Sequence, residues 1–374
     1  MREELFFTLS ILAFWLAVYA LSRILPLNRH GVEVKPLLLK YNSKGFKSLL
    51  YKFSSRWRRA WTFFSYVSIL LGFGLMLFAI TFLLGNLIEF LLPGGEGAAI
   101  TPIIPGLTLS LYWLPYFLIA VIVAVLTHES AHGIVALMER IDVKSAGILV
   151  LGIFPGGFVE VDEDEIDALP RRSRMKIFSA GSSSNLIFGL LALLLISTIF
   201  ASNPSGMIVV NVLEDGPLHR AGIGRWDVIY ALNNTRICGY SDLANFMSRV
   251  KPGDRLIVST SRGDFTIVSA RNPEDENKAI IGILPPYLPY HQNLLGLDPF
   301  WGLQVHLTLT WLFVVSISVA IFNMLPIPMF DGDRFLQCLM DRVAERFRNP
   351  LKRFFNILSI FLIAANIILS LRIF

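Results

Sequence analysis

The sequence has few charged residues and almost no cysteine. Charged side chains make up 16% of its 374 residues, while hydrophobic residues make up 54%. A soluble domain usually carries about 25% charged residues, so the deficit argues against an ordinary soluble protein and predicts several membrane spans. The two cysteines, Cys238 and Cys338, are too few for a disulfide framework or a cysteine-based zinc site.

Six apolar stretches are long enough to form helices that cross a bilayer, which takes about 20 residues. They are Leu5–Leu25, Phe63–Leu92, Leu111–Met138, Ile177–Ala201, Phe300–Leu325 and Phe354–Phe374. For the first stretch, a cleavable signal peptide is the alternative. Arg23 stands near its end, however, where a small-residue cleavage site would be expected. The pattern therefore predicts a polytopic α-helical membrane protein with about six transmembrane helices.

Lysine and arginine are unevenly distributed among the connecting segments. They concentrate in residues 28–61, 171–176 and 334–353, whereas Pro93–Thr108 contains none. Short loops rich in basic residues stay in the cytoplasm, so six spans place these three segments there and both termini outside. Topology thus accounts for the formal net charge of +5, and we expect no nucleic-acid partner.

The segment 203–287, between the fourth and fifth spans, has the pattern of a small α/β domain outside the cytoplasm. Strands are expected at Met207–Leu213 and Trp226–Asn233, followed by a helix from Ser241 to about Val250 and a last hairpin. Its order resembles a PDZ domain of bacterial proteases, carried by Gly206, Gly216-Pro217, Ala221-Gly222-Ile223 and Asp227-Val228-Ile229, with Trp226 where glycine is usual. Since PDZ domains bind peptide ends by strand addition, a peptide or substrate end is an expected partner. A structural plug that binds nothing is the alternative.

Three polar side chains in the third span have the spacing His-Glu-x-x-His. His128 and His132 are four residues apart and share one helix face, where two imidazoles can bind one Zn²⁺. Such an ion lowers the pKa of its water to about 7. Glu129 can then take the proton of the attacking zinc-bound water and deliver it to the leaving amine, as general acid/base. Because charged groups inside a span are costly, a metal-free polar cluster is the weaker explanation.

A third protein ligand is needed, because catalytic zinc usually has three. The end of the fifth span, FNMLPIPMFDGDRF, supplies Asp331, with Asp333 as a rival. Pro326 and Pro328 break the helix there. Such a break inside a membrane is tolerated where it lines protein or water, which fits a cavity around a metal.

The ordered set of motifs resembles the site-2 proteases, intramembrane zinc metalloproteases of the M50 type, over roughly residues 112–335. The matching segments are His128–His132, Asn323–Gly332, Ala180–Asn185 and Gly152–Asp162. Phe330 and Ser182 depart from the leucine and proline that are usual there. The resemblance implies Zn²⁺, Asp331 as the third ligand and Glu129 as acid/base, and it assigns Asn185 and Asn323 to contacts with substrate or transition state.

The expected activity is hydrolysis of peptide bonds within transmembrane segments of single-span membrane proteins in the lipid bilayer, as in regulated intramembrane proteolysis. His128 lies more than halfway along its span, so cleavage is expected near the cytoplasmic side. Residues 148–161, centred on a turn at Pro155–Gly157, are expected to form a re-entrant β-hairpin that offers an edge to substrate. An ordinary interfacial loop is the alternative.

Two other classes stay open from the residues alone. A membrane metalloprotease of the prenyl-peptide type also carries HExxH, but takes its third ligand from a glutamate. A non-enzymatic PDZ-bearing membrane scaffold would not need the three polar residues together. The expected parts are 1–110 (two spans and the basic loop), 111–202 (HExxH helix, hairpin and fourth span), 203–287 (PDZ-like domain), 288–335 (Asp-Gly helix) and 336–374 (last span).

Overall fold

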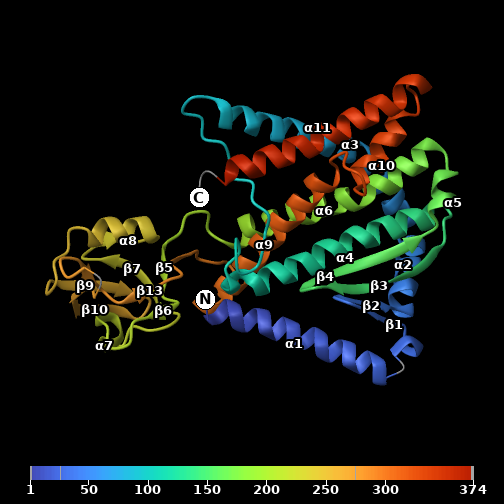
Figure 1. Ribbon diagram of the computed structural model, residues 1–374. Helices are drawn as coiled ribbons and strands as arrows, with labels where there is room; N and C mark the ends of the chain where they lie inside the picture. Colours follow the sequence, from blue (N-terminus) through green and yellow to red (C-terminus); the bar gives the residue numbers. More distant parts are fainter. Residues whose placement is uncertain (1, 26, 274, 372–374) are drawn as a thin grey trace. The chain divides into compact units, whose positions relative to one another are not determined.

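The computed structural model describes residues 2–25, 27–273 and 275–371 (Figure 1). The chain divides into two compact units, one of Met1–Ala192 with Trp311–Phe374 and the other of Leu193–Thr310. The first unit holds the long helices and one β-sheet. The second holds most of the short strands.

Within the described residues, five helical segments are long and apolar enough to cross a membrane. They are α3 (Arg58–Leu91), Leu111–Met138 with α4 (Leu114–Met138), α6 (Arg171–Ile199), α9 (Pro299–Asn323) and α11 (Glu345–Ser370). They coincide with the second to sixth predicted spans, although α3, α6 and α11 begin earlier, at charged residues. In α1 (Arg2–Ile24) the apolar part Thr8–Ile24 is shorter, so the first span stays a prediction.

A four-stranded antiparallel sheet completes the first unit. Its order is β1 (Val32–Lys35), β2 (Leu38–Asn42), β3 (Val143–Leu151) and β4 (Phe154–Val161). The first two strands and α2 (Lys44–Arg56) lie in the basic segment 28–61, whose sequence indicated only its side of the membrane. Ser43 starts α2 by accepting a hydrogen bond from the Phe46 N–H at 3.2 Å.

The predicted hairpin exists, but its predicted turn is wrong. The chain turns at Gly152 and Ile153, while Pro155, Gly156 and Gly157 pair with β3 inside β4. Gly152 has a φ of +63°, a conformation that glycine adopts without steric cost. Pro155 is tolerated because β4 is the edge of the sheet.

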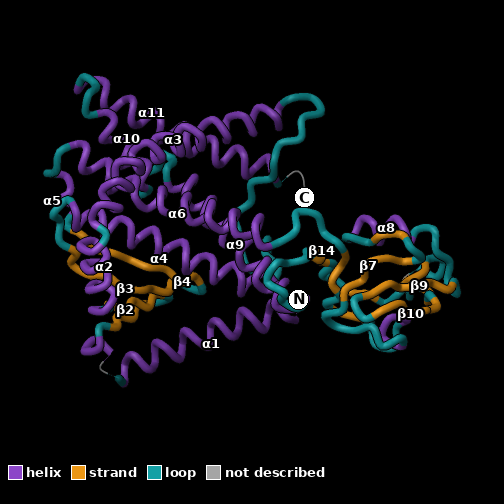
Figure 2. Tube along the Cα trace, turned by 180° about the vertical axis from the view of Figure 1, so that it is seen from behind, coloured by secondary structure: helices purple, strands orange, loops and turns teal. Residues whose placement is uncertain are grey.

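The helices α4 and α1 lie beside the outer strands of this sheet. In Figures 1 and 2, α4 runs along β4 and α1 lies on the β1 side. Trp15 of α1 donates its indole N–H to the carbonyl of Gly152 at 2.9 Å, so α1 is tied to the hairpin turn. The β4 edge is thereby placed beside the helix that carries His128, Glu129 and His132.

The second unit contains a sheet of order β10-β9-β7-β5-β14, with β8 paired to β7. Its strands are β5 (Gly206–Ile208), β7 (Val228–Leu232), β8 (Thr235–Arg236), β9 (Arg255–Thr260), β10 (Gly263–Val268) and β14 (Leu288–Tyr290). Shorter pairs are formed by β6 (Asn211–Val212) with β13 (Ile283–Leu284), and by β11 (Ala270–Arg271) with β12 (Ala279–Ile280). The helices are α7 (Pro217–Arg220) and α8 (Tyr240–Met247), and Leu218, Ile229 and Leu243 contribute to one buried core.

The predicted strand Met207–Leu213 is wrong as a single element, because β5 and β6 divide it and pair with different partners. A tight two-residue turn joins β7 to β8: Asn233 and Asn234 both have positive φ, as such a turn requires. Trp226 has a φ of +75°. This left-handed conformation is the physical reason why glycine suits that position.

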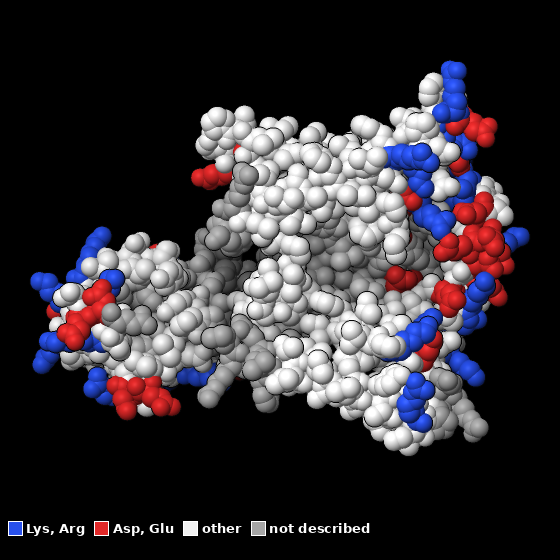
Figure 3. Space-filling model, in the orientation of Figure 1, with Lys and Arg blue, Asp and Glu red and all other residues white. Residues whose placement is uncertain are grey.

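Charged side chains gather at one end of the first unit. Figure 3 shows lysine, arginine and acidic residues around the end where Figure 1 labels α2, α5 (Glu163–Asp167) and α10 (Asp331–Met340). Away from this end, the long helices of the first unit carry few charges. The same face is hollowed beside this end. This distribution is what a bilayer around the apolar length of the helices requires.

Candidate active site

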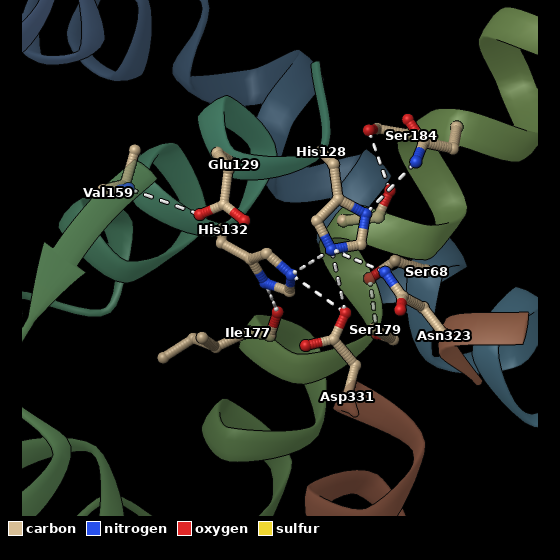
Figure 4. A network of polar contacts seen from close by, with 12 residues as sticks. Ser68, His128, Glu129, His132, Val159, Ile177, Ser179, Ser184, Asn323 and Asp331 are labelled. Atoms are coloured by element: carbon tan, nitrogen blue, oxygen red, sulfur yellow. Dashed lines mark hydrogen bonds and ion pairs between the residues drawn. The ribbon is translucent and has the colours of Figure 1, made fainter. Parts of the chain in front are cut away.

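His128, His132 and Asp331 converge although 199 residues separate the last two. The Nε2 atoms of the two histidines are 3.1 Å apart, and Asp331 Oδ2 lies 3.1 Å from each of them. Figure 4 shows the three side chains turned toward one another, two from α4 and one from the start of α10. The three ligand atoms form a triangle that one ion can fill.

The chemistry of these atoms fits a cation. His132 Nδ1 lies 2.7 Å from the carbonyl of Ile177, which can only accept, so Nδ1 carries the proton and a neutral His132 presents a lone pair at Nε2. Zinc–nitrogen distances near 2.05 Å in a tetrahedral site put ligand atoms about 3.3 Å apart. The observed 3.1 Å separations therefore suit one zinc ion.

Two glycines allow the close approach. A Cβ on Gly181 of α6 would stand 2.3 Å from His132 Nε2 and 2.7 Å from His128 Nε2, so a larger residue would fill the space for the metal. A Cβ on Gly332 would stand 2.3 Å from the carbonyl oxygen of Met324. The helix break between Asn323 and Asp331 confirms the effect expected of Pro326 and Pro328.

Asp333 is engaged elsewhere. Its carboxylate lies 3.0 Å from Lys352 Nζ and accepts a hydrogen bond from Asn356 Nδ2 at 3.1 Å. Asp333 is thus tied to α11, whereas Asp331 faces the histidines. Sequence spacing alone left the two aspartates as rivals.

Glu129 lies beside the triangle and outside it. Its Oε2 accepts a hydrogen bond from the backbone N–H of Val159 on β4 at 3.3 Å, as Figure 4 shows. With the three ligand candidates it lines a cavity of about 540 Å³, whose wall also includes Val159, Val161, Met329 and Phe330. The lining also includes Glu163, Asp167 and Arg334, which belong to the charged end.

The two asparagines occupy different places. Asn323 Nδ2 lies 3.4 Å from His128 Nε2 on the metal side of that ring, and its side chain is partly exposed. Asn185 is fully buried and lies 3.2 Å from His128 Nδ1, on the other side of the ring. Asn185 does not line the cavity.

Cys338 of α10 takes no part in this chemistry. Burial raises the pKa of its thiol to about 11, so the side chain remains a neutral thiol.

Several contacts of the site could not be found from the sequence. The Ile177 carbonyl and the Val159 N–H belong to the backbone, which no residue pattern identifies. Thr127 precedes His128, and its Oγ1 lies 3.0 Å from Asn185 Oδ1, but a threonine in an apolar helix gives no signal of that contact.

Apolar helices of membrane length, together with a histidine-histidine-aspartate donor set and an adjacent glutamate, are features of integral-membrane metalloproteases as a class. The sequence model of peptidase family M50 matches residues 116–368, more than half of the chain. The chain belongs to peptidase family M50.

Curated relatives agree with this membership. An uncharacterized protein of Methanocaldococcus jannaschii is 28% identical over 255 residues, which are 67% of this chain and 64% of the relative. A membrane-bound transcription factor site-2 protease homolog of Arabidopsis thaliana is 30% identical over 36% of this chain and 27% of its own length. The regulator of sigma-W protease RasP of Bacillus subtilis is 22% identical over 56% of this chain and 52% of its own length. The chain thus spans less than two thirds of the length of each of these relatives.

Proposed function

We propose that the protein is an intramembrane zinc metalloendopeptidase that hydrolyses peptide bonds within transmembrane segments of single-span membrane proteins. The observation that carries the proposal is the triangle of His128, His132 and Asp331, with Glu129 in the same cavity. The prenyl-peptide class would require a glutamate as third ligand, and the third donor here is an aspartate. A non-enzymatic scaffold would not need the donor set.

His128, His132 and Asp331 would hold Zn²⁺, with Asp331 as third ligand. When bound, the ion supplies Lewis acidity, which activates a water molecule and polarises the scissile carbonyl. Asn323 lies on the metal side of His128, so its amide N–H can donate to the carbonyl oxygen as negative charge develops there.

Glu129 serves as general acid and base. It accepts the proton of the attacking water and later gives it to the nitrogen of the leaving amine. The Val159 N–H orients the carboxylate toward β4 while leaving its second oxygen available. This arrangement keeps the base at the wall of the cavity, within reach of a bound peptide.

An extended substrate would pair along the edge of β4 at backbone groups other than the Val159 N–H, which is bonded to Glu129. A transmembrane helix hides its carbonyls in hydrogen bonds between residues i and i−4, so it must unwind before hydrolysis. An edge strand offers unpaired backbone groups that an unwound segment can pair with, and Val159 and Val161 of this edge line the cavity. The hairpin then acts as the re-entrant element that holds the substrate strand.

The insert of residues 203–287 is proposed to be a PDZ-like domain on the extracytoplasmic side, which docks substrate ends or filters substrates by size. The distribution of basic residues supports a cytoplasmic position for the charged end of the first unit. Glu163, Asp167 and Arg334 of that end line the cavity, which supports an opening toward the cytoplasm. Water and the cut products would therefore exchange with the cytoplasm.

Cleavage of a reconstituted single-span protein tests this function. The protein and a substrate with basic residues on one flank are placed in liposomes, and the new chain ends are identified by mass spectrometry. We expect cuts inside the span, in its cytoplasmic half, because His128 lies in the second half of α4. Cuts confined to loops outside the span would contradict the proposal, as would no cleavage of any of a panel of such substrates.

A further inference from the structure

The two histidines of the centre each have a polar partner behind the ring. For His132 that partner is the carbonyl of Ile177, 2.7 Å from Nδ1, which holds the proton on Nδ1 and leaves Nε2 free. Histidines that ligate metals almost always donate their other ring N–H to such a partner, which fixes the tautomer and the ring orientation. His128 needs an equivalent acceptor at its own Nδ1.

Only the side chain of Asn185 is bonded to His128 Nδ1 among the contacts of the described residues, at 3.2 Å. The atom placed there is the amide nitrogen Nδ2, while Oδ1 lies 3.0 Å from the hydroxyl of Thr127. The two ends of an asparagine amide have nearly the same shape, so their assignment is decided by the hydrogen-bond network.

The network favours the opposite orientation once a metal is bound. With Nδ2 against Nδ1, the proton of a neutral His128 would sit on Nε2, pointing at His132 Nε2 and Asp331 Oδ2, where it would exclude a cation. With Oδ1 against Nδ1, the ring N–H donates to the amide oxygen and Nε2 presents its lone pair to the ion.

Thr127 permits this orientation without losing a hydrogen bond. Its hydroxyl proton can go to the carbonyl of Val123 at 2.9 Å or of Ala124 at 3.0 Å. The hydroxyl oxygen is then free to accept from Asn185 Nδ2. The amide oxygen and one N–H of the amide nitrogen then each have a hydrogen-bond partner, in a side chain with no exposed surface.

We infer that Asn185 is a positioning residue for the metal centre, which accepts the Nδ1–H of His128 and thereby sets the tautomer that binds zinc. This inference rests on the proposed function. It replaces the direct contact with substrate that the resemblance implies for Asn185. Asn185 is fully buried and lies outside the cavity lining, so a peptide in the cavity does not reach it.

Zinc affinity of Asn185 variants, measured by competition with a chromophoric chelator, tests the inference. We expect N185A to bind zinc about 10- to 100-fold more weakly, the usual cost of losing such a partner. N185D should stay closer to the wild type, because a carboxylate oxygen still accepts from Nδ1–H. The control S184A removes a neighbouring hydroxyl that bonds only to backbone carbonyls, of Thr127 and Gly181, and should leave the affinity unchanged.

A second readout separates positioning from a role in the reaction itself. The visible spectrum of the Co²⁺-substituted protein reports coordination geometry, and we expect N185A to change it and N185D to restore it. Wild-type zinc affinity and an unchanged cobalt spectrum in folded N185A would overturn the inference. So would a loss of zinc in N185D equal to that in N185A. If the wild-type protein itself binds no zinc, the proposed function fails instead.

Discussion

Replacement of Glu129 by glutamine is expected to lower the rate of peptide hydrolysis by about 10²- to 10⁴-fold, the usual contribution of a general acid/base. Glutamine has nearly the same shape, and its carbonyl oxygen can still accept the Val159 N–H that holds Glu129 now. The amide cannot take a proton from water. The measurement is the initial rate of cleavage of a reconstituted single-span substrate.

E129Q should also keep its zinc, because Glu129 stands outside the triangle of ligand candidates. The control is E165Q, which removes a charge from an exposed glutamate of the neighbouring α5 and should cleave at the wild-type rate. Cleavage by E129Q at more than about a tenth of the wild-type rate would assign the proton transfer to another group.

Replacement of Asp331 by alanine is expected to weaken zinc binding by more than about 100-fold, beyond the usual cost of losing a partner behind a ligand. The variant would leave two imidazoles, whereas catalytic zinc usually has three protein ligands. Cleavage should be lost together with the metal. Zinc affinity by chelator competition and the cleavage rate are measured on the same preparation.

Asp333 provides a matched control for this change. D333A removes a carboxylate two residues away that binds Lys352 and Asn356. It should lower thermal stability, since it leaves Lys352 without its ion pair, but it should keep zinc. If D333A lost zinc while D331A retained it, Asp333 and not Asp331 would be the third ligand.

The spans were predictable because a bilayer imposes one simple requirement, a run of about 20 apolar residues. Five of the six predicted stretches meet it in the described structure. The ends of the helices were less predictable, since α6 begins at Arg171 and α11 at Glu345. The first turns of these helices are charged, so they can extend into water beyond the apolar stretch.

The sheet was harder to predict, since its pairing is not local. The α-helices α2, α3 and α4 separate β1 and β2 from β3 along the chain. The register of β2 with β3 depends on how the chain returns after these helices. The turn of the hairpin was misplaced because Pro-Gly-Gly is the stronger turn signal by composition. In the structure Gly152 makes the turn, and the edge position of β4 tolerates Pro155.

The residues of the site likewise include some that local sequence spacing predicts and some that depend on the tertiary structure. His128, Glu129 and His132 were found from a helical spacing that has a direct chemical meaning. The sequence favoured Asp331 and left Asp333 as a rival. In the structure the path of the chain after Pro326 and Pro328 turns Asp331 toward the histidines and Asp333 toward Lys352. The resemblance singled out Asn185, but its position behind His128 depends on the packing of α6 against α4, which the motif does not indicate.

The zinc content of the purified wild-type protein tests the central claim most directly. Mass analysis of protein prepared without added chelator should find one zinc ion per chain, and D331A prepared alongside should contain almost none. A wild-type protein that holds no zinc, and takes up none when zinc is supplied, would contradict the account.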